Sequence, residues 1–212
     1  MSSAATGRFI TLEGGEGAGK STQIARLSDW LRQKGRTVVT TREPGGSPGA
    51  ELIRKLLVEG PAERWDGTTE ALLHFAARRD HLRATVWPAL RRGDWVISDR
   101  FADSTIAYQG NGHGLDREML QRLYQVAVGE FRPDLTLILD LPIEAGLARA
   151  AARRGSETRY ESLSAEFHER VRAGFIEIAR REPGRCVVID ATQGIDTVSA
   201  AIARAVSQRL AV

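Results

Sequence analysis

A predicted strand, a glycine loop and a predicted helix follow one another within the first 33 residues, and this succession limits the fold more than any other part of the chain. The strand is predicted at Phe9–Glu13 and the helix at Lys20–Gln33. Between them, residues 14–21 read Gly-Gly-Glu-Gly-Ala-Gly-Lys-Ser and match the phosphate-binding pattern G-x-x-x-x-G-K-[ST]. Glycines let successive backbone N–H groups turn toward a phosphate, and the helix N-terminus adds partial positive charge. The sequence therefore predicts a site for a nucleoside triphosphate.

The side chains of this loop have separate expected roles. Lys20 is expected to reach the β and γ phosphates, and the Ser21 hydroxyl to ligate Mg²⁺. The residues predicted to bind the nucleoside triphosphate are Gly14, Gly15, Glu16, Gly17, Ala18, Gly19, Lys20, Ser21 and Thr22.

Short apolar runs alternate with longer segments of helical period along the rest of the chain. Four more strands are predicted at 37–41, 95–98, 135–140 and 186–189, and helices at 49–58, 69–91, 117–129, 143–153, 164–181 and 197–210. Such alternation is typical of βαβ units around a mainly parallel sheet. The predicted class is α/β, a P-loop NTPase fold with three α/β/α layers, a five-stranded parallel sheet and a helical lid region.

Composition and length favour one domain that acts on small molecules. Residues 1–7 are predicted to be a disordered tail, residues 8–212 a single P-loop domain, and residues 150–162 its lid, which includes an arginine-rich loop. The apolar runs are too short to span a membrane, and a net charge of +3 is weak support for a nucleic-acid surface. The single Cys186 cannot form an internal disulfide and is expected to be buried. We expect a cytoplasmic protein that binds neither membrane nor nucleic acid.

Polar residues at the ends of two predicted strands indicate a second phosphate group. Asp99 and Arg100 follow the strand at 95–98, at the sheet edge where ligands bind in open α/β folds. Asp99 is expected to hold Mg²⁺ through water, and Arg100 to bind an acceptor phosphate. Arg42 follows another strand in a proline- and glycine-containing loop that could aim it inward. An exposed ion pair is the alternative interpretation of Asp99 and Arg100.

The predicted helix at 69–91 carries a candidate base-binding pair. Phe75 and Arg78 are three residues apart and share a helix face, so a ring and a guanidinium could meet a flat base together. An aromatic residue at helical spacing is, however, more often part of the core.

Three reaction classes are compared: a GTPase switch, an ATPase that activates water, and a kinase that transfers the phosphoryl group to a second substrate. The chain has no Asn-Lys-x-Asp tetrapeptide of the kind that reads guanine, and Asp99 is followed by arginine where a water-activating ATPase would usually have glutamate. These features favour phosphoryl transfer to a second substrate. Another nucleoside monophosphate or deoxynucleoside kinase and a nucleotide-dependent switch remain as alternatives.

Five segments taken together resemble bacterial thymidylate kinases. They are LEGGEGAGKST, TREPGG, FAAR, SDRFADSTIAYQG and FRPDLTLILD, and in this order they extend over most of residues 8–194. The resemblance implies transfer of the γ-phosphate of ATP to dTMP, with Mg²⁺, by a homodimer. It also implies that Lys20, Arg100, Arg149, Arg153 and Arg159 are catalytic and that Ser21 and Asp99 serve the metal. The implied dTMP-binding residues are Glu16, Arg42, Phe75, Arg78, Arg100, Ser104, Thr105, Tyr108 and Gln109.

Two details of the family pattern leave choices open. The family places its catalytic arginine either in the phosphate loop or in the lid, and residues 15–18 contain none, so the resemblance implies that the lid supplies the catalytic cation, from Arg149, Arg153 or Arg159. Related lids often read Asp-Arg-aromatic-Glu, whereas residues 158–161 read Thr-Arg-Tyr-Glu, which leaves the choice among these arginines open. The stacking aromatic residue can fall three or four positions before the arginine, so Phe75 with Arg78, His74 with Arg78 and Phe75 with Arg79 are the alternatives. We expect Phe75 with Arg78, because Pro88 then falls at the distance from the arginine that relatives show.

Overall fold

The computed structural model describes residues 7–152 and 159–212. Most of the predicted tail at 1–7 and the central part of the predicted lid, including Arg153, lie outside the described residues. Within them, no helix is both long enough and apolar enough to cross a membrane.

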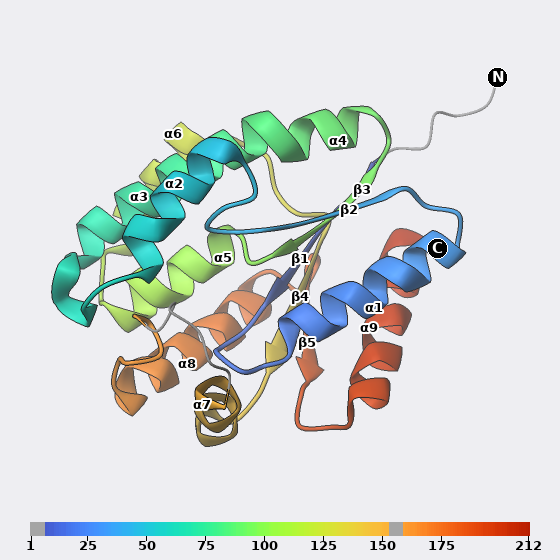
Figure 1. The fold of residues 1–212 in the computed structure, drawn as a ribbon. Coiled ribbons are helices and arrows are strands. Elements are labelled where there is room, and N and C mark those ends of the chain that lie inside the picture. Colours follow the sequence, from blue (N-terminus) through green and yellow to red (C-terminus); the bar gives the residue numbers. More distant parts are fainter. Residues whose placement is uncertain (1–6, 153–158) are drawn as a thin grey trace.

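The described strands form one parallel sheet of five strands in the order β2-β3-β1-β4-β5 (Figure 1). This confirms the predicted fold class. All carboxyl ends therefore lie along one edge of the sheet. The bounds are β1 Phe9–Glu13, β2 Val38–Arg42, β3 Trp95–Asp99, β4 Leu135–Asp140 and β5 Cys186–Asp190.

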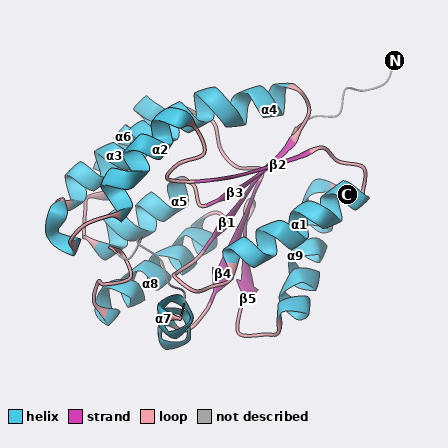
Figure 2. Ribbon diagram, viewed as in Figure 1, coloured by secondary structure: helices cyan, strands magenta, loops and turns pink. Residues whose placement is uncertain are grey.

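Helices cover both faces of this sheet and give the three layers (Figure 2). Alternate residues of β1 point to opposite faces. Ile10 and Leu12 pack in a core with α1 and α9, whereas Phe9 packs with α3 and α4 on the other face. The longer helices are α1 Lys20–Gln33, α2 Pro48–Val58, α3 Gly67–His81, α6 Arg117–Ala127, α7 Ile143–Ala151, α8 Ala165–Arg181 and α9 Ile195–Leu210.

The helix predicted at 69–91 is interrupted in the structure. A wide π-helical segment, η2 (Leu82–Val86), separates α3 from the short α4 (Trp87–Arg91). Pro88 lies just after the wide segment and cannot donate a backbone hydrogen bond to the preceding turn, which is a common cause of such irregularity.

A short 3₁₀ turn, η1 (Ala62–Arg64), precedes α3. A helical stretch after β3 was not predicted from the sequence. This α5–η3 stretch consists of α5 (Ala102–Thr105) and the π-helical η3 (Ile106–Gly112). Glycines at the end of η3 interrupt the apolar period by which a helix is predicted. The α5–η3 stretch nevertheless carries several residues of the site described below.

Candidate active site

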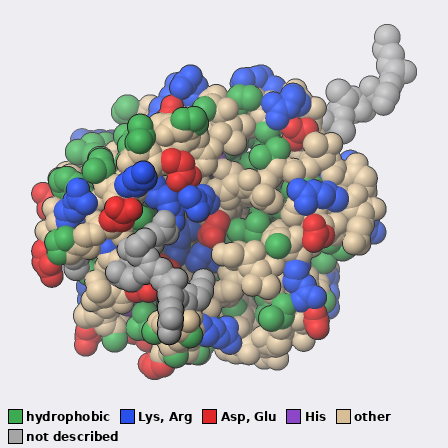
Figure 3. All heavy atoms as spheres, viewed as in Figure 1, with side chains coloured by type: hydrophobic (Ala, Val, Ile, Leu, Met, Phe, Trp, Pro, Cys, Tyr) green, Lys and Arg blue, Asp and Glu red, His purple; other side chains and the backbone are tan. Residues whose placement is uncertain are grey.

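A cavity of about 600 Å³ opens at the carboxyl edge of the sheet, between the phosphate loop and the helices α2, α3 and η3. Basic side chains gather in a recess on the face drawn in Figure 3. The described residues that line the cavity are Glu16, Gly17, Ala18, Gly19, Lys20, Ser21, Arg42, Glu43, Pro44, Arg54, Val58, His74, Asp99, Arg100, Ser104, Tyr108, Gln109, Tyr160 and Glu161.

Most of the predicted phosphate loop lies at this cavity, and its path depends on glycine. Gly17 has φ 69°, and a Cβ atom there would lie 2.0 Å from the carbonyl oxygen of Gly146 in α7. The loop is therefore in direct backbone contact with that helix. Lys20, at the start of α1, donates from Nζ to the carbonyl oxygens of Gly14 (3.2 Å) and Gly15 (3.0 Å). Its ammonium group is thus already directed at the inside of the loop.

Arg100 joins the phosphate loop to η3. It follows β3 with φ 69°, a left-handed conformation that is unusual for an arginine. Its Nη1 donates to Gly14 O at 3.0 Å and to Ser104 Oγ at 3.1 Å. Its Nη2 donates to Glu16 Oε1 at 2.8 Å and to Tyr108 Oη at 3.0 Å. These contacts hold the guanidinium at the wall of the cavity.

Glu16 is the carboxylate on the other side of this ion pair. Burial pushes the pKa of Glu16 upward, but the charges of Arg100 and Lys20 and the hydrogen bond from Tyr108 outweigh it and bring the pKa to about 2. The Tyr108 hydroxyl donates to Glu16 Oε1 at 2.8 Å. Glu16 is therefore a fixed negative charge at physiological pH.

Glu13, at the end of β1, is a buried carboxyl that sequence analysis did not single out. It accepts hydrogen bonds from Phe101 N (2.7 Å) and Ser104 Oγ (2.6 Å), on both sides of the turn that follows Arg100. Burial and the nearby charge of Asp103 raise the pKa of Glu13 to about 8. Its place at a strand end next to the glycine loop was a signal that sequence analysis could have used.

Two further basic residues line the cavity from the β2 side. Arg42 was predicted; its Nη2 lies 3.0 Å from Glu51 Oε2, and its side chain is about half exposed. Arg54 of α2 was not predicted, and it donates to Pro44 O at 2.6 Å. Arg54 falls on the same helix face as the buried Ala50 and Leu57. Arg54 could have been identified from the sequence as a basic residue within the apolar face of a predicted helix.

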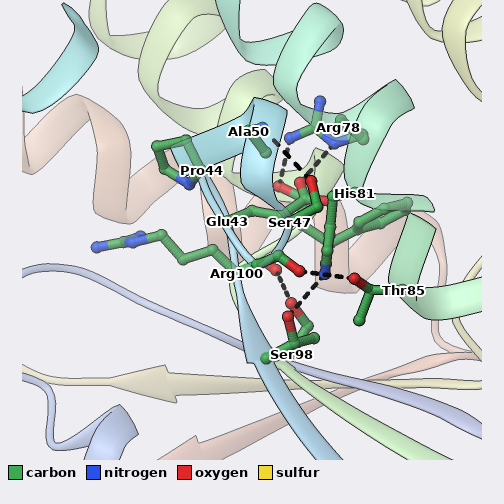
Figure 4. A network of polar contacts seen from close by, with 12 residues as sticks. Glu43, Pro44, Ser47, Ala50, Arg78, His81, Thr85, Ser98 and Arg100 are labelled. Atoms are coloured by element: carbon green, nitrogen blue, oxygen red, sulfur yellow. Dashed lines mark hydrogen bonds and ion pairs between the residues drawn. The ribbon is translucent and has the colours of Figure 1, made fainter. Parts of the chain in front are cut away.

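Arg78 is fixed in a buried network between α3 and the loop after β2 (Figure 4). Its Nε donates to Glu43 Oε2 at 2.7 Å, and Glu43 Oε1 accepts from His81 Nδ1 at 2.9 Å. Burial raises the pKa of Glu43, but Arg78 and His81 outweigh that effect and hold the pKa below its usual value. The Nη2 of Arg78 donates to Phe101 O and to Thr105 Oγ1, each at 3.1 Å. Arg78 and Thr105, two of the residues implied to bind dTMP, are thus brought together.

Two buried polar atoms near this network have no hydrogen-bond partner among the described residues. They are Nη1 of Arg78, which can only donate, and Oε1 of Gln109, which can only accept. Both side chains are almost completely buried, and Gln109 lines the cavity. Because buried polar groups are rarely left unpaired, these atoms indicate a ligand that accepts beside Arg78 and donates beside Gln109.

Phe75 is not among the described residues that line the cavity, although the Arg78 guanidinium lies over its ring, 4.9 Å from the centroid. The two residues therefore meet as expected, but the expected place of Phe75 beside a base is corrected. Phe75 is 4% exposed and packs edge-on against Tyr124 in the core below α3. The ring that lines the cavity is His74, the second of the alternatives, four residues before Arg78 and on its helix face. Burial and the charge of Arg78 lower the pKa of His74 to about 3, so this ring is neutral at physiological pH.

Asp99 and Ser21, the predicted metal residues, both line the cavity. Asp99 Oδ1 is buried and has no hydrogen-bond partner among the described residues. Carboxylate and hydroxyl oxygens are ligands that suit Mg²⁺. No group of three or more His, Cys, Asp or Glu residues within the described chain could hold a metal ion by itself. This donor set fits an ion that is bound partly by phosphates.

The two predicted lid arginines that the structure describes, Arg149 and Arg159, do not line the cavity. Arg149 lies exposed on the last turn of α7, and Arg153 lies outside the described residues. Arg159 is 2% exposed; it donates to the carbonyl oxygens of Leu57 (3.2 Å) and Pro61 (3.1 Å). Its Nη2 is paired with the Glu70 carboxylate. In this structure Arg159 therefore holds its segment against α2 and α3 rather than facing the phosphate loop.

Comparison with known proteins identifies the family of this chain. The family model described as thymidylate kinase matches residues 12–202. A thymidylate kinase of Caulobacter vibrioides is 59% identical over 204 residues, which covers 96% of this chain and 98% of the relative. One from Bradyrhizobium sp. (strain ORS 278) is 52% identical over 206 residues, covering 96% and 91%. A crystal structure of thymidylate kinase from Ehrlichia chaffeensis has a TM-score of 0.78 and 33% identity, covering 95% of this chain and 99% of that one. The chain belongs to the thymidylate kinase family.

Proposed function

We propose that this protein transfers the γ-phosphoryl group of ATP to dTMP and releases ADP and dTDP. The observation that carries the proposal is the single cavity that unites the phosphate loop with Arg42 and Arg100. Phosphoryl transfer requires mainly that two phosphates be aligned and their charge neutralised, and such a cavity can do both. The relatives named above are thymidylate kinases, and their names supply the choice of acceptor.

The donor side is formed by the phosphate loop. Its backbone N–H groups and the N-terminus of α1 would hold the triphosphate, with Lys20 placed at the β and γ phosphates. Ser21 and the unpartnered carboxylate oxygen of Asp99 would hold Mg²⁺ directly or through water. When bound, Mg²⁺ supplies positive charge to the β and γ phosphates.

The acceptor side is formed by Arg100 and Arg42, which would bind the dTMP phosphate. A phosphate oxygen of dTMP forms the new bond to the γ-phosphorus, and the bond from that phosphorus to the β–γ bridging oxygen breaks, so that ADP leaves. Glu16 and Tyr108 lie beside Arg100. We assign Glu16 to the 3′-hydroxyl of the sugar, and Tyr108 to the place that a ribose 2′-hydroxyl would need.

The base would lie beside α3 and η3. Arg78 Nη1 can donate to the 4-keto oxygen of thymine, and Gln109 Oε1 can accept from its N3–H group. His74 supplies a neutral ring for stacking in place of Phe75. Ser104 and Thr105 complete this wall through their contacts with Arg100 and Arg78.

The positive charge that balances the transferred group is the remaining part of the proposal. The phosphate loop has no arginine between Gly15 and Ala18, and Arg159 is engaged with Glu70. We therefore assign this role to Arg149 or Arg153, on the family resemblance.

A coupled assay of ADP release tests the proposal with dTMP, dUMP, dCMP, dGMP and AMP as acceptors. We expect rapid release with dTMP and none without an acceptor. Arg100→Ala should lower kcat/KM for dTMP at least about 100-fold while leaving the Kd for ATP within about threefold, because Arg100 belongs to the acceptor side. Faster turnover with another monophosphate would replace the substrate, and no acceptor-dependent release from any of them would favour a nucleotide switch.

We also propose that the protein is a homodimer. Large apolar side chains are exposed on three helices that pack side by side, α2, α3 and α6. Exposed apolar side chains gathered on one layer of helices indicate an interface. Its members are Leu52, Leu56, Leu72 and Val126, with exposures of 68%, 38%, 51% and 85%.

A further inference from the structure

Glu70 is a buried carboxylate that neither the phosphate chemistry nor the base contacts described above use. It lies in the first turn of α3 and is fully buried. Arg159 Nη2 is paired with its Oε1. Its Oε2 accepts from Gln109 Nε2 at 2.9 Å and from Tyr160 Oη at 3.2 Å, and His113 Nε2 lies 3.4 Å away.

The charge state of Glu70 decides how Gln109 can be oriented. Burial raises the pKa of Glu70, but hydrogen bonds from His113, Arg159 and Gln109 outweigh it and bring the pKa to about 2. An ionised carboxylate can only accept hydrogen bonds. The Gln109 amide must therefore turn its NH₂ group toward Glu70, which leaves its oxygen on the opposite side.

The Gln109 oxygen is the buried acceptor that has no partner among the described residues. The unpartnered Nη1 of Arg78 lies close to it in the fold, because Arg78 Nη2 donates to Thr105, one helical turn before Gln109 in the α5–η3 stretch. We propose that Glu70 is a positioning residue for base selection, which fixes the Gln109 amide with its oxygen toward the base. This rests on the proposed function of the site.

The site would then present one hydrogen-bond donor, from Arg78, and one acceptor, from Gln109, to the base. Thymine offers a keto oxygen and an adjacent ring N–H, which match Arg78 and Gln109. Cytosine offers an amino group and an unprotonated ring nitrogen at the corresponding atoms, so both contacts would be mismatched. A site that hydrogen-bonds a base rejects a mismatched one strongly, because its own buried groups are then left unpaired.

Arg159 should fix the orientation of the amide in a Glu70→Gln variant. Since Arg159 can only donate, the oxygen of the new amide should face it, and the new NH₂ group should face Gln109. The Gln109 amide would then turn over and present its NH₂ group to the base. The substitution is nearly isosteric, yet it should convert the acceptor at the base site into a donor.

The experiment compares kcat/KM for dTMP and dCMP in the wild type, Glu70→Gln, Gln109→Met and the double variant. In Glu70→Gln we expect the dTMP/dCMP ratio to fall at least about tenfold, mostly through KM for dTMP, with KM for ATP unchanged. In the Gln109→Met background, Glu70→Gln should change the ratio less than about twofold, because the effect acts through Gln109. Glu169→Gln, on the exposed face of α8, is the matched control and should match the wild type.

Each other outcome has one meaning. A ratio that Glu70→Gln leaves within twofold of the wild type would overturn the inference, and so would an equal fall in the Gln109→Met background, which would indicate general loosening. Either result still requires a wild type that phosphorylates dTMP. A wild type without that activity would instead refute the proposed function. Thermal melting of the wild type and the three variants identifies a variant that fails to fold. If Glu70→Gln fails to fold, Glu70→Asp replaces it. We expect Glu70→Asp to raise KM for dTMP when residue 109 is the native glutamine and not in the Gln109→Met background.

Discussion

Glu13 is the residue whose protonation should be most visible in the stability of this protein. Its pKa is raised from 4.5 to about 8 by burial and by Asp103. Between these two values the folded state holds a proton that the unfolded state has lost, so stability falls as the pH rises. Below about pH 4.5 both states are protonated, and above about pH 8 neither is, so the effect is confined to this window.

Glu13→Gln should remove this dependence. The amide oxygen can accept from Phe101 N as the carboxyl does, and its NH₂ group can donate to Ser104 Oγ. In urea unfolding from pH 5 to pH 9, the free energy of unfolding of the variant relative to the wild type should rise by on the order of 4 kcal/mol up to about pH 8 and then level off. A difference that does not vary with pH would contradict the raised pKa. Glu169→Gln serves as the exposed control.

His74 and Phe75 show what sequence could and could not decide at the scale of one residue. The motif identified the helix and Arg78, but neighbouring residues on a helix point about 100° apart, and both rings fit the family spacing. Only the packing of α3 against Tyr124 distinguishes them. Arg159 is a similar case, since its position in the chain says nothing of its pairing with Glu70, a contact between residues 89 positions apart.

The assignment of His74 to the base predicts a contrast between these two neighbours. His74→Ala should raise KM for dTMP about tenfold, the usual effect of losing one stacked ring, and His74→Phe should restore it. Phe75→Leu should lower the Tm through the core while leaving KM for dTMP nearly unchanged. Steady-state kinetics and thermal melting of the three variants check both statements. A larger rise in KM for dTMP in Phe75→Leu than in His74→Ala would show that Phe75, and not His74, stacks on the base.

At the scale of elements, the five strands were predicted within one residue at each end, because apolar runs bounded by glycine and charged residues have few alternatives. The α5–η3 stretch was missed because no regular period marks it, although it carries Ser104, Thr105, Tyr108 and Gln109. Its position is set by tertiary contacts, which include the bond from Ser104 to Glu13 and the packing of η3 against α8. Local sequence preference does not contain such contacts.

The contact between α7 and the phosphate loop is an element-scale feature with a direct test. A Cβ atom at Gly146 would lie 2.5 Å from the carbonyl oxygen of Glu16, a backbone atom that cannot move without shifting the loop. Alanine is otherwise the better helix former, so Gly146→Ala would gain about 1 kcal/mol if the contact were absent. We expect instead that it lowers the Tm and weakens ATP binding about tenfold or more. Calorimetric titration with ATP measures this, and Gly184→Ala, where nothing lies within 4 Å of the added Cβ, is the control.

At the scale of the whole molecule, one layer differs from the rest in its surface. The α2, α3 and α6 layer exposes four large apolar side chains, although these helices already cover the sheet. The sequence places apolar residues on all three helices, but only the packed structure shows which of them remain exposed. The proposed dimer would cover this surface and leave the carboxyl edge of the sheet accessible to both substrates.

Leu72→Glu tests the proposed dimer, because Leu72 lies on α3, the helix that packs against both α2 and α6, and a charge in an apolar interface costs several kcal/mol once water is excluded. Light scattering after size exclusion should give a wild-type mass near twice the 23.2 kDa of one chain and a variant mass near that of a single chain. Ile195→Glu is the matched control, since Ile195 is 57% exposed at the start of α9, a helix outside this layer, and its variant should keep the wild-type mass. A wild type that elutes as a single chain, or a Leu72→Glu protein that stays paired, would show that the apolar layer is not the interface. Because Leu72 lies two residues from His74 on α3, loss of the partner should also raise KM for dTMP by loosening that helix.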